Sequence, residues 1–230
     1  MKIGIILTPD NRSKAYLSKI IENNIKLDTF VFMNDNRSEQ VFDPLLIDES
    51  KKSGFDISKS VRELLVEHNI SFKEFNFVDI NNPLLIDYVK NSDIDYFVFT
   101  GGGILRSEIL DAGSKFIHLH PGIVPNYRGS TCFYYSILNE NNCGVTCFVM
   151  DENLDTGKII LQKTFSPPSH IFIDEIYDPF IRSEVLVQVL QNNLLHTGNF
   201  SEQDPDSGET YYIIHPVLKH IAILSTVNQS

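Results

Sequence analysis

The sequence KFIHLHPGIVPNYRG, residues 115–129, begins with an apolar run that carries two histidines two positions apart. The run is rich in strand-forming residues and a Pro-Gly pair stops it, so we predict a short buried strand. Because side chains alternate across a strand, His118 and His120 should point to the same face at its carboxyl end. Open α/β sheets bind ligands at that end of their strands, so we expect a site there.

A second motif, LDTG at residues 154–157, lies between two apolar runs and places Asp155 in a glycine-containing turn. Two imidazoles and one carboxylate at the ends of strands can transfer protons. The same groups can also hold a metal ion. The residues alone therefore indicate a reactive site and leave its chemistry open.

Taken together, the two motifs resemble the folate-dependent formyltransferases over residues 97–165. Members of that family carry Asn-x-His on a strand, followed by a Leu-Leu-Pro-like run and a Gly. A Leu-Asp-x-Gly loop comes about one helix and one strand later. The resemblance implies that His120 is the catalytic His and that Asp155 is the catalytic Asp, whereas His118 stands where the family has its catalytic Asn.

The resemblance also implies that N10-formyltetrahydrofolate donates the formyl group. Three consecutive glycines after a predicted strand let the backbone approach a ligand closely, and the family's pterin pocket lies in this part of the chain. The residues expected to bind the donor are Gly102, Gly103, Ile104, Leu105, Met150, Asp151 and Leu154. The residues considered for contacts with the acceptor are Arg12, Tyr127, Arg128, Gly129 and Tyr211, although each also fits an ordinary surface position.

Formyl transfer to an amine passes through a tetrahedral intermediate, whose developing oxyanion must be stabilised while protons are moved. The resemblance gives the proton transfer to His120 and the orientation of its ring to Asp155. Where the family uses an Asn amide, His118 can donate a ring N–H to the formyl oxygen. Two neighbouring imidazolium groups repel each other, so we expect at most one positive charge over the two histidines.

Alternating strand and helix patterns predict an α/β fold with a doubly wound, mostly parallel, twisted sheet. The runs 144–150 and 158–165 have a short connection and should pair antiparallel. No GxGxxG follows the first predicted strand, which argues against a dinucleotide cofactor. We expect a catalytic domain over residues 1–195 and a short carboxyl-terminal extension, residues 196–230, that packs on it. The polar stretch 34–55 is predicted to be a partly ordered loop over the substrate side.

The chain has 230 residues and a formal net charge of -11, with no run of basic residues. Proteins that grip nucleic-acid phosphates need a clustered positive surface, so we expect no nucleic-acid partner and no tRNA substrate. No apolar run is long enough to span a bilayer and no leader sequence opens the chain, so we expect a cytoplasmic protein without a membrane partner. Within the family resemblance, a chain of this size implies a small-molecule amine acceptor, and an amino sugar, with or without a nucleotide, is favoured. Whether the protein forms a homodimer stays open.

Two other functions stay open as well. His-x-His with a distant Asp can bind zinc, which would make the protein a metal-dependent hydrolase. We nevertheless expect no tightly bound metal, because His170 and His215 are unsupported as further ligands and the three cysteines have no metal-ligand spacing. The second alternative is a non-catalytic folate- or nucleotide-binding protein, since the family's catalytic Asn is replaced.

Overall fold

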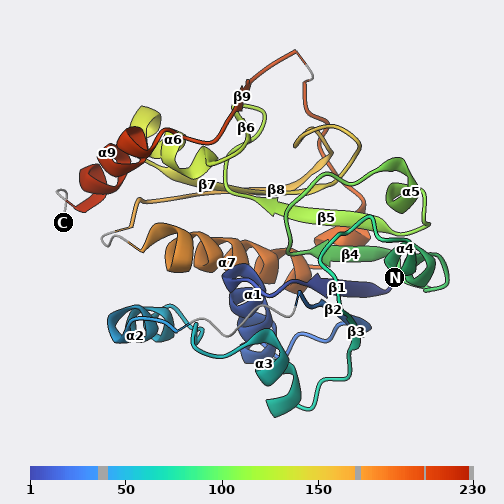
Figure 1. Cartoon of the computed structure of the whole chain (residues 1–230). Coiled ribbons are helices and arrows are strands. Elements are labelled where there is room, and N and C mark those ends of the chain that lie inside the picture. The colour runs from blue at the N-terminus through green and yellow to red at the C-terminus, as the bar shows by residue number, and fades with distance from the viewer. Residues whose placement is uncertain (36–40, 169–171, 205, 228–230) are drawn as a thin grey trace. The chain divides into compact units, whose positions relative to one another are not determined.

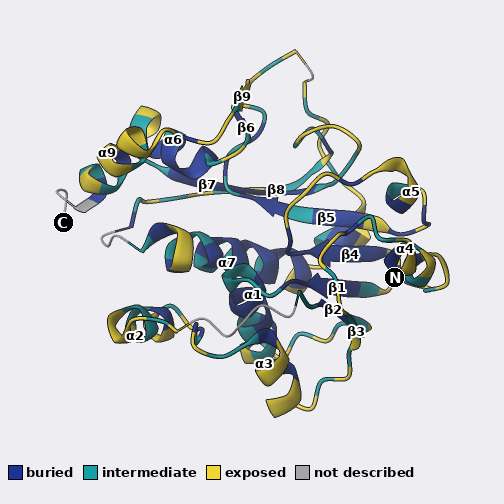
Figure 2. Ribbon diagram, in the orientation of Figure 1, coloured by how far each residue is buried: buried dark blue, intermediate teal, exposed yellow. Residues whose placement is uncertain are grey.

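A computed structural model of the chain describes residues 1–35, 41–168, 172–204 and 206–227. The chain forms two compact units. The first contains Met1–His118 and Met150–Glu152, and the second contains Leu119–Val149 and Asn153–Ser230. Figure 1 labels the helices and strands along the chain, and Figure 2 shows how far each residue is buried.

The strands of the first unit pair in parallel, in the order β3-β2-β1-β4-β5. Their bounds are Ile3–Leu7 (β1), Thr29–Met33 (β2), Lys73–Phe75 (β3), Tyr96–Phe99 (β4) and Lys115–His120 (β5). The helices of this unit are Asn11–Glu22 (α1), Pro44–Lys52 (α2), Val61–Glu67 (α3), Pro83–Lys90 (α4) and Ser107–Leu110 (α5). The chain moves outward from β1 to β3 and then returns to β4 on the other side of β1, which is the topology of a doubly wound sheet.

These strands are buried on both faces because apolar residues fill nearly every position of β1, β2 and β4. One face joins the apolar residues of α4 and α5 in a cluster that includes Phe97, Phe99 and Phe116. The alternate residues, such as Ile5 and Val98, are equally buried and therefore face the other side. Figure 2 shows these strands in the colour of buried residues. Burial of this kind is typical of a parallel sheet with helices on both faces.

Side-chain caps fix where the helices of the first unit begin. Asp10 caps α1, Asp43 caps α2, and a capping box of Ser60 and Glu63 starts α3. Because Asp10 is the cap, α1 begins at Asn11. Arg12 therefore lies in the first turn of a helix.

The second unit combines a hairpin, a small parallel strand pair and several helices. Its strands are Tyr127–Gly129 (β6), Cys143–Val149 (β7), Ile159–Phe165 (β8) and Glu209–Tyr211 (β9). Its helices are Cys132–Glu140 (α6), the π-helix Ile173–Tyr177 (η1), Asp178–Gln191 (α7), Leu194–Thr197 (α8) and Pro216–Val227 (α9). β7 and β8 pair antiparallel, as predicted, whereas the parallel pairing of β6 with β9 was not foreseen.

The predicted α/β fold with a mostly parallel sheet is confirmed. The stretch 34–55, predicted as a loop, contains helix α2, and its residues 36–40 lie outside the described part of the chain. Whether this stretch covers the substrate side stays a prediction, as does the domain boundary at residues 195–196. Within the described ranges, none of the helices combines the length and apolar character needed to cross a membrane.

Candidate active site

His120, the last residue of β5, lies in the second unit with only 2% of its surface exposed. Its Nε2 lies 2.8 Å from the carbonyl oxygen of Tyr127. A carbonyl can only accept, so Nε2 carries the hydrogen of this bond. Gly122 makes the contact possible, because a Cβ at that position would lie 2.9 Å from Nε2 and 2.8 Å from the Tyr127 oxygen.

Asp155 lies in the loop between β7 and β8, and its backbone has a positive φ of 55°. Its Oδ2 accepts a hydrogen bond of 2.7 Å from the Gly129 backbone N–H and lies 3.3 Å from Nδ1 of His120. The same loop passes so close to β7 that a Cβ on Gly157 would lie 1.7 Å from the Val149 carbonyl oxygen. Glycine at residue 157 therefore lets the loop hold the carboxylate against the imidazole.

The two contacts of the imidazole determine how many protons the pair holds. Since Nε2 donates to Tyr127, a neutral His120 would turn the lone pair of Nδ1 toward Asp155 Oδ2. An attractive contact needs one more proton, carried either by Nδ1 or by Oδ2. In both cases His120 and Asp155 together are electrically neutral. Such a pair can take up a proton and release it again.

Burial is the main influence on the imidazole and lowers the pKa of His120. The Asp155 carboxylate opposes this shift, and the Arg182 guanidinium adds to it. The direction favours the neutral imidazole, which is the form that accepts a proton.

Two charged residues of α7, Asp178 and Arg182, influence the pKa of His120 and were not predicted from the sequence. Arg182 is 5% exposed, donates from Nε to Asp178 Oδ1 at 2.7 Å, and donates from Nη1 to the Leu119 carbonyl oxygen at 3.0 Å. The only sequence signal for them was an Asp and an Arg four residues apart in a helical run. That spacing is common on helix surfaces, where such pairs contribute little.

The guanidinium of Arg128, predicted to contact the acceptor, is buried and bonded within the protein. It donates to the Gln203 side chain at 2.9 and 3.2 Å and to the carbonyl oxygens of Asp204 and Ser207. The Gln203 amide in turn donates to the Asp155 carbonyl at 3.0 Å and to the Gly157 carbonyl at 2.8 Å. Arg128 therefore ties the segment before β9 to the Asp155 loop, and its contact with the acceptor stays a prediction.

Tyr127 and Gly129 also have structural tasks in the strand pair β6–β9. The Tyr127 hydroxyl donates to Glu140 at 2.9 Å, and its ring stacks on Tyr211 with centroids 5.4 Å apart. Burial raises the pKa of Tyr127 to about 12. Gly129 has a φ of 95°, and a Cβ there would lie 2.2 Å from the Tyr211 carbonyl oxygen. Whether Tyr127 and Gly129 also contact a substrate stays a prediction. Tyr211 stays a predicted acceptor contact.

The remaining predicted catalytic and acceptor residues lie in the first unit. His118 is half-buried on β5, and its Nδ1 lies 3.3 Å from the Phe99 carbonyl oxygen. Arg12 pairs with Asp10 at 3.2 Å. Both stay predicted site residues.

The predicted donor-binding residues differ in exposure. Gly102 and Gly103 are exposed, and Ile104 is 70% exposed, so all three can meet a ligand. Leu105 is 2% exposed and belongs to the apolar core, and its part in donor binding stays a prediction. Leu154 lies half-exposed in the second unit.

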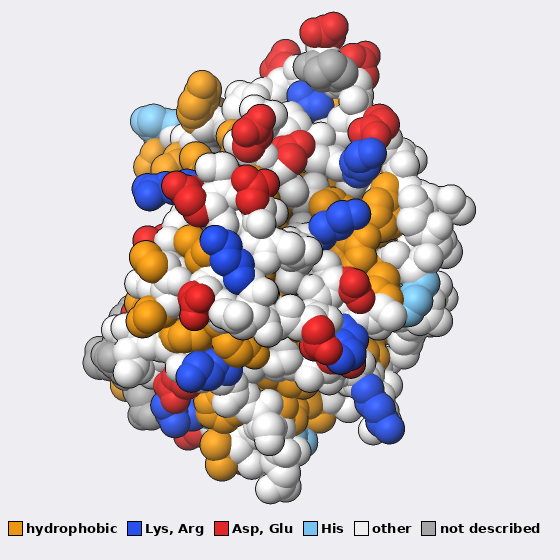
Figure 3. Space-filling model, turned by 90° about the vertical axis from the view of Figure 1, so that its right-hand side faces the viewer, with side chains coloured by type: hydrophobic (Ala, Val, Ile, Leu, Met, Phe, Trp, Pro, Cys, Tyr) orange, Lys and Arg blue, Asp and Glu red, His pale blue; other side chains and the backbone are white. Residues whose placement is uncertain are grey.

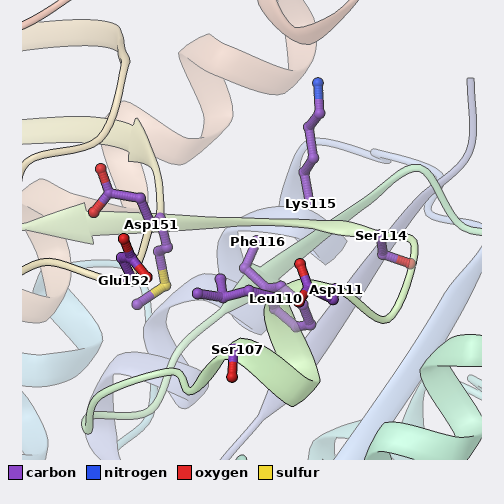
Figure 4. Close-up of a pocket in the computed structure, with 9 residues that line it drawn as sticks. Ser107, Leu110, Asp111, Ser114, Lys115, Phe116, Asp151 and Glu152 are labelled. Carbon is purple, nitrogen blue, oxygen red and sulfur yellow. The ribbon is translucent and has the colours of Figure 1, made fainter.

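Met150 and Asp151 line a pocket of about 370 Å³ in the first unit (Figure 4). The pocket is bounded by the segment after β7, by α5 and by the start of β5. Its lining residues are Ser107, Leu110, Asp111, Ser114, Lys115, Phe116, Met150, Asp151 and Glu152. Figure 4 shows Asp151 and Glu152 across the pocket from Leu110 and Asp111. The pocket thus combines apolar walls with carboxylates that can accept hydrogen bonds.

Among the residues that the structure describes, no group of three or more His, Cys, Asp or Glu side chains could hold a metal ion. His215 is exposed, and His170 lies outside the described residues. His120 and Asp155 are instead engaged with each other and with backbone groups.

A model of the family described as Formyl transferase matches residues 30–178, which is more than half of the chain. The chain belongs to the formyl transferase family. The predicted family resemblance is thereby confirmed. The match includes β5 with His120 and the loop with Asp155, and it ends at the first residue of α7, so Arg182 lies beyond it.

Curated relatives of this formyl transferase family member are methionyl-tRNA formyltransferases. That of Clostridioides difficile is 31% identical over 217 residues, which cover 92% of this chain and 65% of that protein. That of Clostridium perfringens is 28% identical over 218 residues, with the same coverage. This family member therefore spans less than two thirds of the length of these relatives.

Solved structures of other formyltransferases share the fold of this family member. A sugar N-formyltransferase from Shewanella sp. FDAARGOS_354 has a TM-score of 0.61 at 15% identity and covers 98% of this chain and 88% of its own. The N-formyltransferase from Helicobacter canadensis, solved in complex with folinic acid and dTDP-3-aminofucose, has a TM-score of 0.63 at 17% identity, with 99% and 80% coverage. At these identities the likeness shows a common fold.

Proposed function

We propose that this protein transfers a formyl group from N10-formyltetrahydrofolate to the amine of a small acceptor, with an amino sugar favoured. The observation that carries the proposal is the contact between the buried His120 ring and the Asp155 carboxylate, within the segment that matches the formyl transferase family. Formyl transfer needs a group that removes a proton from the attacking amine and returns one to the leaving nitrogen. We expect this chemistry in the cytoplasm.

In the proposed reaction, the acceptor nitrogen bonds to the formyl carbon and the bond from that carbon to N10 of the folate breaks. The amine loses one proton and N10 gains one. Because Nε2 of His120 already carries a hydrogen, the pair of His120 and Asp155 first gives this proton to N10 and then takes up the proton lost by the amine, which restores the pair. For both transfers Nε2 must exchange the Tyr127 carbonyl for the substrate. His118, two residues earlier on β5, is proposed to stabilise the oxyanion in place of the family's Asn.

The pocket bounded by α5 and the segment after β7 is our proposed site for the pterin end of the donor. A pterin is a flat ring whose edge carries N–H donors, and the lining carboxylates of Asp111, Asp151 and Glu152 can accept from such donors. Its volume of about 370 Å³ lies in the range of ligand pockets. Met150 and Asp151 belong both to this pocket and to the donor-binding residues predicted from the sequence.

Replacing Asp151 with Asn should weaken donor binding, because it removes a charged acceptor from the pocket. A hydrogen bond to a charged group contributes about 1.5–3 kcal/mol, so we expect the Kd for folinic acid to rise about tenfold or more. Isothermal titration calorimetry measures this constant. The matched control is Glu108→Gln, an exposed position on α5 outside the pocket lining, which should leave the Kd unchanged. An unchanged Kd in Asp151→Asn contradicts this placement of the pterin.

Charge supports a small acceptor over a nucleic acid. The chain has a formal net charge of -11, and acidic and basic side chains are interspersed over the face drawn in Figure 3. Binding of tRNA phosphates relies on gathered positive charge. The second candidate acceptor is methionyl-tRNA, which the 31% identity to a methionyl-tRNA formyltransferase favours.

A side-by-side acceptor assay separates the two candidates. Tetrahydrofolate release from N10-formyltetrahydrofolate is followed with free amino sugars, with nucleotide-linked amino sugars and with methionyl-tRNA. We expect turnover with an amino sugar and none with methionyl-tRNA above the background without acceptor. Turnover with methionyl-tRNA alone contradicts the small-acceptor proposal while leaving formyl transfer intact.

Three substitutions test the proposed roles within the site. His120→Asn removes the proton carrier, so we expect turnover to fall about 100-fold or more. Asp155→Asn should fall comparably, because the imidazole loses the group that orients it and shares its proton. His118→Asn should cost less than about tenfold, since an amide supplies an uncharged donor.

These rates are compared at saturating donor, with circular dichroism confirming that each variant is folded. If His118→Asn is as inactive as His120→Asn, the two histidines act as a single unit and the separate roles proposed for them are wrong. Full activity in Asp155→Asn contradicts the shared-proton mechanism.

A further inference from the structure

The ion pair of Arg182 and Asp178 lies almost wholly inside the second unit. The two side chains are 6% and 14% exposed, and their α7 helix is buried on most sides. Taking a guanidinium out of water is expensive, and a buried ion pair often contributes no more to stability than apolar side chains of similar volume. A contribution to stability therefore explains this ion pair poorly, and the residues around it suggest a different role.

Arg182 also donates to the strand that carries the reactive imidazole. Nη1 donates to the carbonyl oxygen of Leu119, the residue directly before His120. Nε at the same time donates to Asp178 four residues earlier in α7. The guanidinium thus connects α7 to the peptide next to His120.

We propose that Arg182 and Asp178 are positioning residues, which hold the end of β5 and set the charge balance around His120. The inference rests on the proposed role of His120 in proton transfer. It adds Asp178, the last residue of the segment that the family model matches, and Arg182, which lies beyond that segment. Neither residue is proposed to touch substrate.

The charged and titratable groups around His120 come from the elements packed around it. Asp155 comes from the loop after β7, and Arg182 and Asp178 come from α7. Cys132, at the start of α6, is buried, and burial raises the pKa of its thiol. The Asp155 carboxylate adds to this shift, and the Arg182 guanidinium opposes it. The Phe148 ring of β7, with its centroid 6.5 Å from that of His120, is uncharged.

Within this set, the two residues of α7 act in opposite directions on the imidazole. The positive charge of Arg182 disfavours the imidazolium and lowers the pKa of His120, whereas the negative charge of Asp178 raises it. Arg182 thereby adds to the effect of burial, which is the main cause that lowers the pKa of His120, and opposes the carboxylate of Asp155.

Arg182 and Asp178 are expected to shift the pKa of His120 in opposite directions, which a pair with a purely structural role would not do. The pKa of the His120 ring is measured by NMR titration of the full chain, with His120→Asn used to assign the signal. We expect Arg182→Gln to raise the pKa and Asp178→Asn to lower it, each by roughly 0.5–1 unit. Arg182→Lys keeps the charge and should leave the pKa close to that of the unchanged protein.

The matched control is Lys219→Gln, which removes one positive charge from an ion pair with Asp174 elsewhere in the second unit. It should not move the His120 titration. The proposal is overturned if Arg182→Gln and Asp178→Asn shift the pKa in the same direction or not at all. Should Arg182→Gln fail to fold, Asp178→Asn and Arg182→Lys still decide, because an unshifted Asp178→Asn contradicts the proposal.

Turnover separates this inference from the proposed function on which it rests. If His120→Asn keeps its activity, the role of His120 in formyl transfer is wrong, whatever the titrations show. If His120→Asn is inactive while the titrations do not move, only the role of Arg182 and Asp178 is wrong.

Discussion

The second unit is organised around one imidazole that faces two acceptors. The Tyr127 carbonyl and the Asp155 carboxylate approach opposite nitrogens of His120, and neither contact is attractive without a proton. Because the ring is buried, water cannot satisfy either one. A hydrogen on Nε2 satisfies the Tyr127 carbonyl, and a second proton, shared between Nδ1 and the carboxylate, satisfies the other contact and leaves the pair neutral. The pair is therefore prepared for proton transfer before any substrate arrives.

Much of the surrounding structure keeps the two acceptors in place. Gly122 and Gly157 permit approaches that any side chain would block. The Gly129 N–H holds the carboxylate at 2.7 Å. Arg128 and Gln203 bind the segment before β9 to the Asp155 loop. Arg128, which was considered as an acceptor contact from the sequence, thus helps to build the site. The reactive groups, His120 and Asp155, come from the two short sequence motifs.

The sequence predicts the elements whose signals are local. The strand with two histidines and the antiparallel pair β7–β8 both follow from the residue pattern and the turn residues. The β6–β9 pair escaped prediction because strands of three residues carry too few side chains to show alternation. The internal contacts of Arg128 and Arg182 were not predicted because their partners are backbone and side-chain groups set by the tertiary fold. No local pattern encodes such contacts.

The proton positions on His120 test the central claim most directly. Nitrogen-15 NMR of the imidazole at neutral pH, with one-bond couplings to attached protons, reports which ring nitrogen carries hydrogen. The account predicts a proton on Nε2, bonded to the Tyr127 carbonyl, and a Nδ1 signal that changes when Asp155 is replaced by Asn. A ring with a bare Nε2 and a proton on Nδ1 alone would contradict the shared-proton pair.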